Sequence, residues 1–183
     1  MFGINMLDKS FLPLIHTLVD HGWNGKWDIM QEEIHLDTRP IKEPIDYHEA
    51  LRIMLCIGTQ LAVMQSNNES VFLFFDEDIE QLDEGWYTIV KKERWVPIVA
   101  NDTVELQSPI LLPPDLPPEL VNLREKKMIP FRTNVSVAYF SLAQYVLRKM
   151  NLTKLEAIDS TPLYFMLKRC LRENPEERSF LFV

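Results

Sequence analysis

The stretch that decides the fold reads Pro162-Leu-Tyr-Phe-Met-Leu-Lys-Arg-Cys-Leu-Arg-Glu-Asn-Pro-Glu-Glu-Arg-Ser-Phe-Leu-Phe-Val183. Thr161 is a good N-cap, and Pro162 suits the first position of a helix. Asn174-Pro175 ends that helix and can begin another one. The sequence therefore predicts a helix over residues 162–172. Its buried face is an apolar stripe at helical spacing, formed by Leu163, Met166, Leu167, Cys170 and Leu171.

Two more amphipathic helices are predicted upstream of this stretch. The first begins at Asp46 and ends at 67–69, and Arg52 and Gln60 fall off its apolar stripe. That stripe consists of Tyr47, Ala50, Leu51, Met54, Leu55, Gly58, Leu61 and Ala62. The second helix is capped by Thr133 or Asn134, and its buried face holds Tyr139, Leu142, Ala143, Val146, Leu147 and Met150. We expect both stripes to pack against the helix over 162–172 in one core.

The remaining signals are shorter. Two helices are expected near the N-terminus, over 11–21 and 27–34. Residues 71–75, 86–90 and 95–100 are strand candidates because they are apolar, β-branched or aromatic, and 83–85 is a turn. Residues 109–120 hold five prolines and are expected to be irregular. This order predicts an α+β fold that is mostly helical, with a small β-region.

Composition excludes several classes of function. The chain has 183 residues, enough for one domain, and its net charge of -8 argues against a nucleic-acid partner. No apolar run reaches the roughly 18 residues of a membrane span. Residues 1–10 lack a basic segment followed by an apolar one, so we expect a protein that is not secreted.

Three motifs resemble the C-terminal lobe of the protein kinase fold. They are Pro117-Pro118-Glu119, the stretch Tyr139-Phe-Ser-Leu-Ala143, and Asn174-Pro-Glu-Glu-Arg178. In that family the matching arginine is buried and pairs with a glutamate far upstream. The resemblance therefore implies a structural ion pair between Glu119 and Arg178.

The whole chain is similar to a group of small, catalytically degenerate kinase-like proteins of large DNA viruses of algae and protists. The residues that carry this similarity are 45–47, 58–61, 75–79, 163–165 and 180–183. The resemblance implies a single C-lobe-like domain over 1–183 without an N-terminal ATP lobe. Residues 1–44 would be a helical extension packed on that domain.

The chemistry of a kinase is missing from the sequence. There is no glycine-rich loop, no strand lysine and no Asp-Phe-Gly. By the resemblance, Asp78 falls where kinases carry an asparagine, and Leu73 falls where they carry the catalytic aspartate. Leu73 cannot accept a proton. We interpret Asp76, Glu77 and Asp78 as a solvated acidic turn rather than a cation site, and the histidines and cysteines lack metal-site spacing.

The sequence thus favours a catalytically inactive, kinase-like scaffold without a cofactor. It would bind another protein, either a viral capsid or a host protein, as a virion, assembly or regulatory component in the host cytoplasm or the virion. The alternative is a divergent active protein kinase, or a half-kinase completed by a partner chain. Only that alternative requires ATP and Mg²⁺.

Overall fold

The computed structural model describes residues 2–5, 27–28, 33–36, 38–82, 85–91, 94–100, 102–107, 112, 115–121 and 129–180. Its α-helices are α2 (Tyr47–Ser66), α4 (Val137–Lys149) and α5 (Pro162–Cys170). The short 3-10 helix η4 (Leu155–Ile158) lies between α4 and α5, and a second one, η5 (Pro175–Glu177), follows α5. Its strands are β1 (Phe2–Asn5), β2 (Trp27–Asp28), β3 (Glu33–Leu36), β4 (Arg39–Pro40), β5 (Glu69–Val71), β6 (Ile79–Gln81), β7 (Tyr87–Ile89), β8 (Trp95–Ala100), β9 (Thr103–Leu106) and β10 (Phe131–Asn134).

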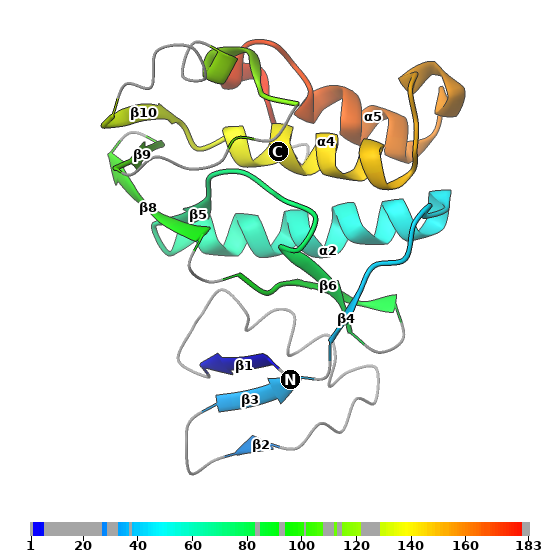
Figure 1. Cartoon of the computed structure of the whole chain (residues 1–183). Helices are drawn as coiled ribbons and strands as arrows, with labels where there is room; N and C mark the ends of the chain where they lie inside the picture. Colours follow the sequence, from blue (N-terminus) through cyan, green and yellow to red (C-terminus); the bar gives the residue numbers. More distant parts are fainter. Residues whose placement is uncertain are drawn as a thin grey trace.

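The strands of the described residues form antiparallel sheets beside the helices, which gives a mixed α/β fold (Figure 1). One sheet has the order β1-β3-β2, a second β10-β9-β8-β5, and a third β4-β6-β7. In the second sheet Ser70 pairs with Val96, and a β-bulge lies between Ile98 and Ala100. The prediction of a mostly helical fold with a small β-region, like a kinase C-terminal lobe, is therefore wrong. Short β segments such as β6 and β9 carry too few residues for a period-2 pattern to stand out.

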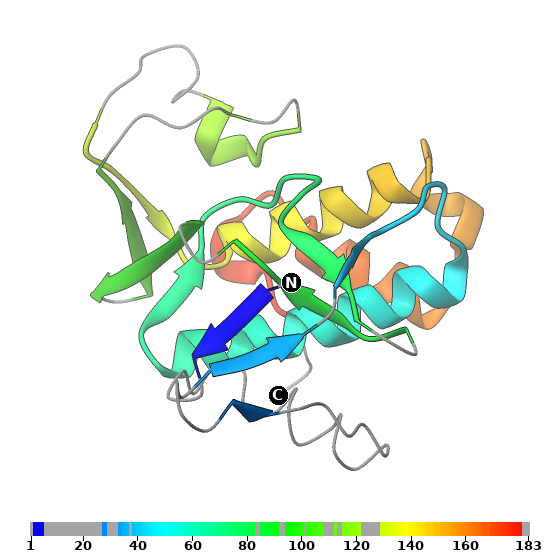
Figure 2. The same cartoon turned by 60° about the horizontal axis from the view of Figure 1, so that its bottom comes forward.

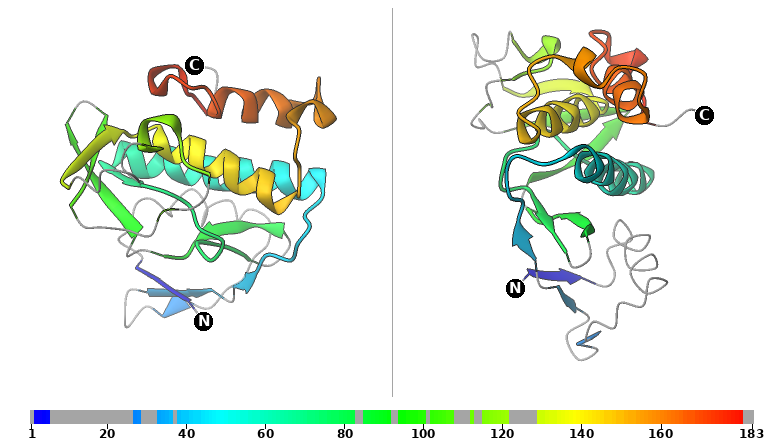
Figure 3. Two further views of the ribbon diagram at one scale, coloured as in Figure 1. Left: turned by 45° about the horizontal axis from the view of Figure 1, so that its top comes forward. Right: turned by 90° about the vertical axis from the view of Figure 1, so that its right-hand side faces the viewer.

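The three α-helices pack as the sequence predicts. Asp46 caps α2 by accepting a hydrogen bond from the Glu49 N–H at 2.8 Å, and Thr161 caps α5 through the Tyr164 N–H. Helices α2 and α4 lie side by side, and α5 covers α4 (Figure 3). Their side chains share one apolar core, whose central members include Ile53, Met54, Leu61, Leu142, Val146, Leu163 and Leu167.

Two positions on α2 differ from the predicted stripe. Leu55 was expected in the core, but 45% of it is exposed. Gln60 was expected outside, yet it is buried against the outer edge of β7, where its amide donates to the Tyr87 carbonyl at 2.8 Å and accepts from the Ile89 N–H at 3.2 Å. The reason is that β7 packs on α2 and needs a polar partner there, because unpaired buried backbone groups are costly.

The other boundaries shift in smaller ways. Helix α4 begins at Val137, since 131–134 form β10 and the Asn134 side chain instead accepts from the Ser136 N–H at 2.8 Å. The helix expected over 11–21 lies outside the described residues. The helix expected over 27–34 is wrong where the structure describes it, because 27–28 and 33–36 are strands of one sheet, seen from below in Figure 2.

Candidate functional site

The loop that joins β5 to β6 contains the residues that the sequence resemblance assigns to a kinase catalytic loop. It is anchored from within: the Phe74 N–H donates to the Ser141 hydroxyl of α4 at 2.7 Å. Phe72 and Leu73 are buried in a second apolar cluster beside Val104 and Leu106 of β9. The expected strand over 71–75 is therefore confirmed only at Val71, because α4 takes the hydrogen-bonding group that a neighbouring strand would use.

Leu73 cannot act as a base in this loop. Only 2% of it is exposed, and its neighbours in the cluster are apolar. A hydrocarbon side chain carries no group that takes up a proton. The position that the kinase resemblance assigns to a catalytic aspartate is here part of the packing.

Asp78 is buried, so the interpretation of 76–78 as a solvated turn is wrong for this residue. One carboxylate oxygen accepts from the Phe75 N–H at 2.8 Å, and the other lies 2.8 Å from Nε of Arg94. Burial raises the pKa of Asp78 to about 6, although the Phe75 N–H and Arg94 both act to lower it. The first oxygen accepts a hydrogen bond, whereas the second has no hydrogen-bond partner among the described residues and is paired with Arg94 by charge alone.

Arg94 is the residue that ties this loop to the start of β8. Its Nη2 lies 2.6 Å from Glu77 Oε1, and its guanidinium carbon lies 4.0 Å from the centre of the Phe75 ring. Such a cation over an aromatic face is attracted by the ring's electron density. Arg94 therefore combines an ion pair with a buried carboxylate, an ion pair with an exposed one, and a stacking contact.

Asp76 takes part in a different group of charges. Its carboxylate lies 3.4 Å from Nη2 of Arg148 and 3.7 Å from Nζ of Lys149, both at the end of α4. Lys149 is buried and also pairs with Glu43. Asp76 itself is mostly exposed, so these contacts are screened by water and are weak.

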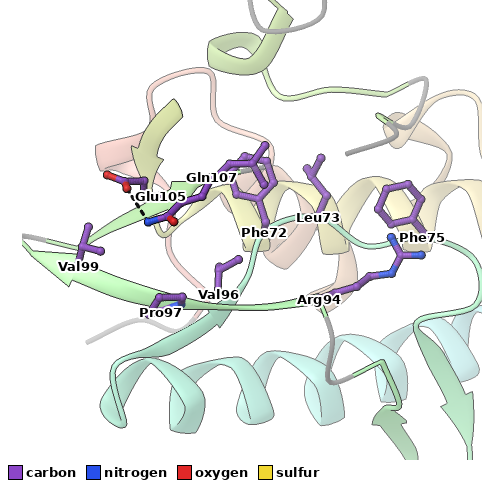
Figure 4. Close-up of a pocket in the computed structure, with 10 residues that line it drawn as sticks. Phe72, Leu73, Phe75, Arg94, Val96, Pro97, Val99, Glu105 and Gln107 are labelled. Carbon is purple, nitrogen blue, oxygen red and sulfur yellow. Dashed lines mark hydrogen bonds between the residues drawn. The ribbon is translucent and has the colours of Figure 1, made fainter. Parts of the chain in front are cut away.

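A pocket of about 420 Å³ opens beside the loop (Figure 4). One wall is the loop itself, and the other is the hairpin of β8 and β9. The lining is mainly apolar, and Val99 on its rim is 48% exposed. The lining residues are Phe72, Leu73, Phe75, Arg94, Val96, Pro97, Val99, Glu105, Leu106 and Gln107.

The polar groups of the pocket are already paired. Glu105 accepts a hydrogen bond from Gln107 at 3.0 Å and pairs with Arg132, and these bonds, that from Arg132 foremost, lower the pKa of Glu105. Arg94 faces Glu77 and Asp78, as described above. The pocket therefore offers an apolar surface whose charges are largely neutralised by one another.

The structure brings Glu119 and Arg178 together in a two-point contact. The guanidinium donates to the two carboxylate oxygens at 2.5 and 2.8 Å, and the Arg178 side chain is fully buried. Arg178 also donates to the backbone carbonyls of Arg172 and Glu173, and it stacks on the Phe140 ring. Residues 118–121 form a helical turn within the segment expected to be irregular. The pair fixes that turn to the segment that follows α5.

The roles of Arg94 and of the pocket are not evident from the amino-acid sequence. In the sequence Arg94 is one of several charged residues between two strand candidates, and no motif marks it. The pocket needs residues from 72–75 and 94–107 at once, and a pattern along the chain does not reveal that pairing. The strand pairing of β5 with β8 is what brings them together.

Within the described ranges, no group of three or more His, Cys, Asp or Glu side chains is placed to hold a metal ion. No helix in the same ranges is both long and apolar enough to cross a membrane. No family model matches the chain, and no curated protein matches it.

Proposed function

We propose that this protein is a catalytically inactive scaffold, related in sequence to protein kinases, that acts by binding another protein. The observation that carries the proposal is the pocket beside the 72–78 loop. The loop's polar side chains are used in contacts within the chain, while an apolar surface next to it stays open. A virion, assembly or regulatory role for a large DNA virus, in the host cytoplasm or the virion, is the setting that the sequence resemblance suggests.

The occupant that best fits the pocket is an uncharged apolar side chain on a segment of the partner. Specific pockets generally enclose roughly 300–1,000 Å³ and combine an apolar lining with a few polar groups. A charged side chain would enter a place where Arg94 and Glu105 already have partners, and it would lose its own hydration without compensation. An aliphatic or aromatic side chain loses nothing of this kind.

The proposal is tested by selecting peptides from a random display library on the full chain at pH 7.5. Affinity of the selected peptides is then measured for the Val99→Asp variant, which places a charge on the pocket rim. Val121→Asp is the matched control, because Val121 is also 48% exposed and does not line the pocket. We expect apolar peptides whose affinity falls at least tenfold in Val99→Asp and stays unchanged in Val121→Asp. Selection of no binder, or an equal loss in both variants, overturns the proposal.

A further inference from the structure

The pairing of β5 with β8 joins the two walls of the pocket, and at one end the carboxylate of Asp78 adds a second link. Asp78 accepts from the Phe75 N–H, on the loop wall, and pairs with Nε of Arg94, at the start of the hairpin wall. The side chains of Phe75 and Arg94 lie next to each other at one end of the pocket (Figure 4). Asp78 does not line the pocket, so its effect on any bound segment is indirect.

The ion pair of Arg94 with Asp78 is stronger than its ion pair with the second carboxylate, that of Glu77. More than half of the Glu77 side chain is exposed, whereas Asp78 is 1% exposed. An ion pair in water is worth little, and the same pair away from water is far stronger. Loss of the charge on Asp78 would therefore leave Arg94 held only by a weak, screened contact and by the Phe75 ring.

The charged and titratable groups around Asp78 are known for the described residues. Arg94 and Lys91 come from the segment between β7 and β8, and Glu77 comes from the same loop as Asp78. Tyr145 of α4 interacts with Asp78 electrostatically. Burial outweighs the two cations and raises the pKa of Asp78 to about 6. A pH change around this value alters the charge that holds the two walls.

We propose that ionised Asp78 fastens the two pocket walls in the shape that binds the partner segment, and that protonation of Asp78 releases this segment. The proposal rests on the proposed function, since it describes how the same pocket is regulated. Its physical basis is preorganisation. When a wall of the pocket is already held in place, less free energy is spent on ordering it when the segment binds. Asp78 is thus a positioning residue that acts through Phe75 and Arg94.

The first test measures the affinity of one selected peptide between pH 8 and pH 5. The peptide should contain no Asp, Glu or His, so that its own charge does not change. For the unchanged protein we expect an affinity that is constant above pH 7 and falls at least fivefold by pH 5. Asp78→Asn should bind weakly at every pH without this fall. Asp76→Asn, on the same loop but in contact with α4, should follow the unchanged protein. A fall that persists in Asp78→Asn overturns the proposal.

The second test does not need a ligand, so it separates this proposal from the proposed function. Nuclear magnetic resonance follows the Asp78 carboxyl carbon, the Arg94 Nε–H and the Phe75 ring in the free protein while the pH is lowered. We expect all three signals to change with one common midpoint. Arg94 and Phe75 signals that stay unchanged while Asp78 titrates refute the fastening role, even if peptides bind. Conversely, a common midpoint without any peptide binding would overturn only the proposed function.

Discussion

The ring of Phe180 fills the space beside Gly58 that any larger residue at this position of α2 would need. A Cβ on Gly58 would lie 2.2 Å from the ring atoms Cε2 and Cζ, well inside contact distance. Phe180 is itself held by stacking on Tyr139, with ring centres 6.1 Å apart, and by a hydrogen bond from Arg169 to its carbonyl. The segment after α5 is thereby packed on α2.

Gly58→Ala should lower the free energy of unfolding by roughly 1–3 kcal/mol through overpacking. Helix propensity alone predicts the opposite, a gain of about 1 kcal/mol for alanine within a helix. Denaturant unfolding measures the difference. In a Phe180→Leu background the smaller side chain should remove most of the loss. If Gly58→Ala stabilised the protein in the unchanged background, the Phe180 ring would have to move aside without a loss of stability.

Removal of the Arg178 side chain in Arg178→Met should destabilise the fold by roughly 3–5 kcal/mol, because the Glu119 carboxylate then loses its partner. Glu119→Gln, which keeps an acceptor for the guanidinium, should cost less. Thermal unfolding of both variants tests this order. Equal stability of Arg178→Met and the unchanged protein would mean that the two-point contact contributes nothing in solution.

Two leucines on predicted apolar stripes should respond differently to truncation. Leu142 is fully buried, so Leu142→Ala leaves a cavity and should cost roughly 2–5 kcal/mol. Leu55 is 45% exposed, and Leu55→Ala should stay within about 1 kcal/mol of the unchanged protein. Chemical denaturation of the two variants measures the change in the free energy of unfolding. The apolar stripe predicted from the sequence alone would give similar losses of stability in both variants, whereas the observed packing predicts a large loss only for Leu142→Ala.

Asp78 should make stability depend on pH in a particular direction. Its pKa is about 6 in the folded protein and ordinary in the unfolded chain, so between these values the folded state keeps a proton that the unfolded state has lost. The stabilisation from this group is complete below the ordinary carboxyl pKa and is lost as the pH rises through about 6. Relative to that of Asp78→Asn, the free energy of unfolding of the unchanged protein should therefore fall by on the order of 3 kcal/mol between pH 4 and pH 7. A difference that is the same at both pH values contradicts the raised pKa.

Incubation with labelled ATP and Mg²⁺ or Mn²⁺ should give no phosphate incorporation into generic substrates. Leu73 is a buried hydrocarbon, and Asp78 is buried and forms an ion pair with Arg94. Kinase catalysis depends on positioned charged groups, so their loss removes the rate rather than part of it. The comparison is with Asp78→Ala. Incorporation that depends on Asp78 would restore the active-kinase alternative.

The helices could be predicted from the sequence because each has a strong local signal. Asp46 and Thr161 are side-chain caps, and the apolar residues of α5 recur at helical spacing over its whole length. The contact between Glu119 and Arg178 was predicted from a resemblance of motifs and not from hydrophobic periodicity. These features depend on residues close together in the chain or on a recognisable pattern.

The strands predicted over 86–90 and 95–100 are confirmed as β7 and β8, but the pairing of the sheets and the pocket could not be predicted in the same way. Strands β5 and β6 are only three residues long, and β5 pairs with β8 and β6 with β4 across long stretches of the chain. Asp78 illustrates the difficulty, because its two acidic neighbours favour a solvated turn, whereas Arg94 and the Phe75 backbone accommodate it in the interior. Burial of a polar residue is decided by its tertiary partners, which its immediate neighbours do not specify.

The amide of Gln60 limits where a strand of another molecule can add to the sheet of β4, β6 and β7. By bonding both the Tyr87 carbonyl and the Ile89 N–H, one side chain does for the edge of β7 what an additional strand would do. An incoming chain finds no vacant backbone groups at those two positions. Extension of this sheet by another molecule is therefore confined to the side of β4, a short strand that contains Pro40, whose nitrogen has no hydrogen to donate.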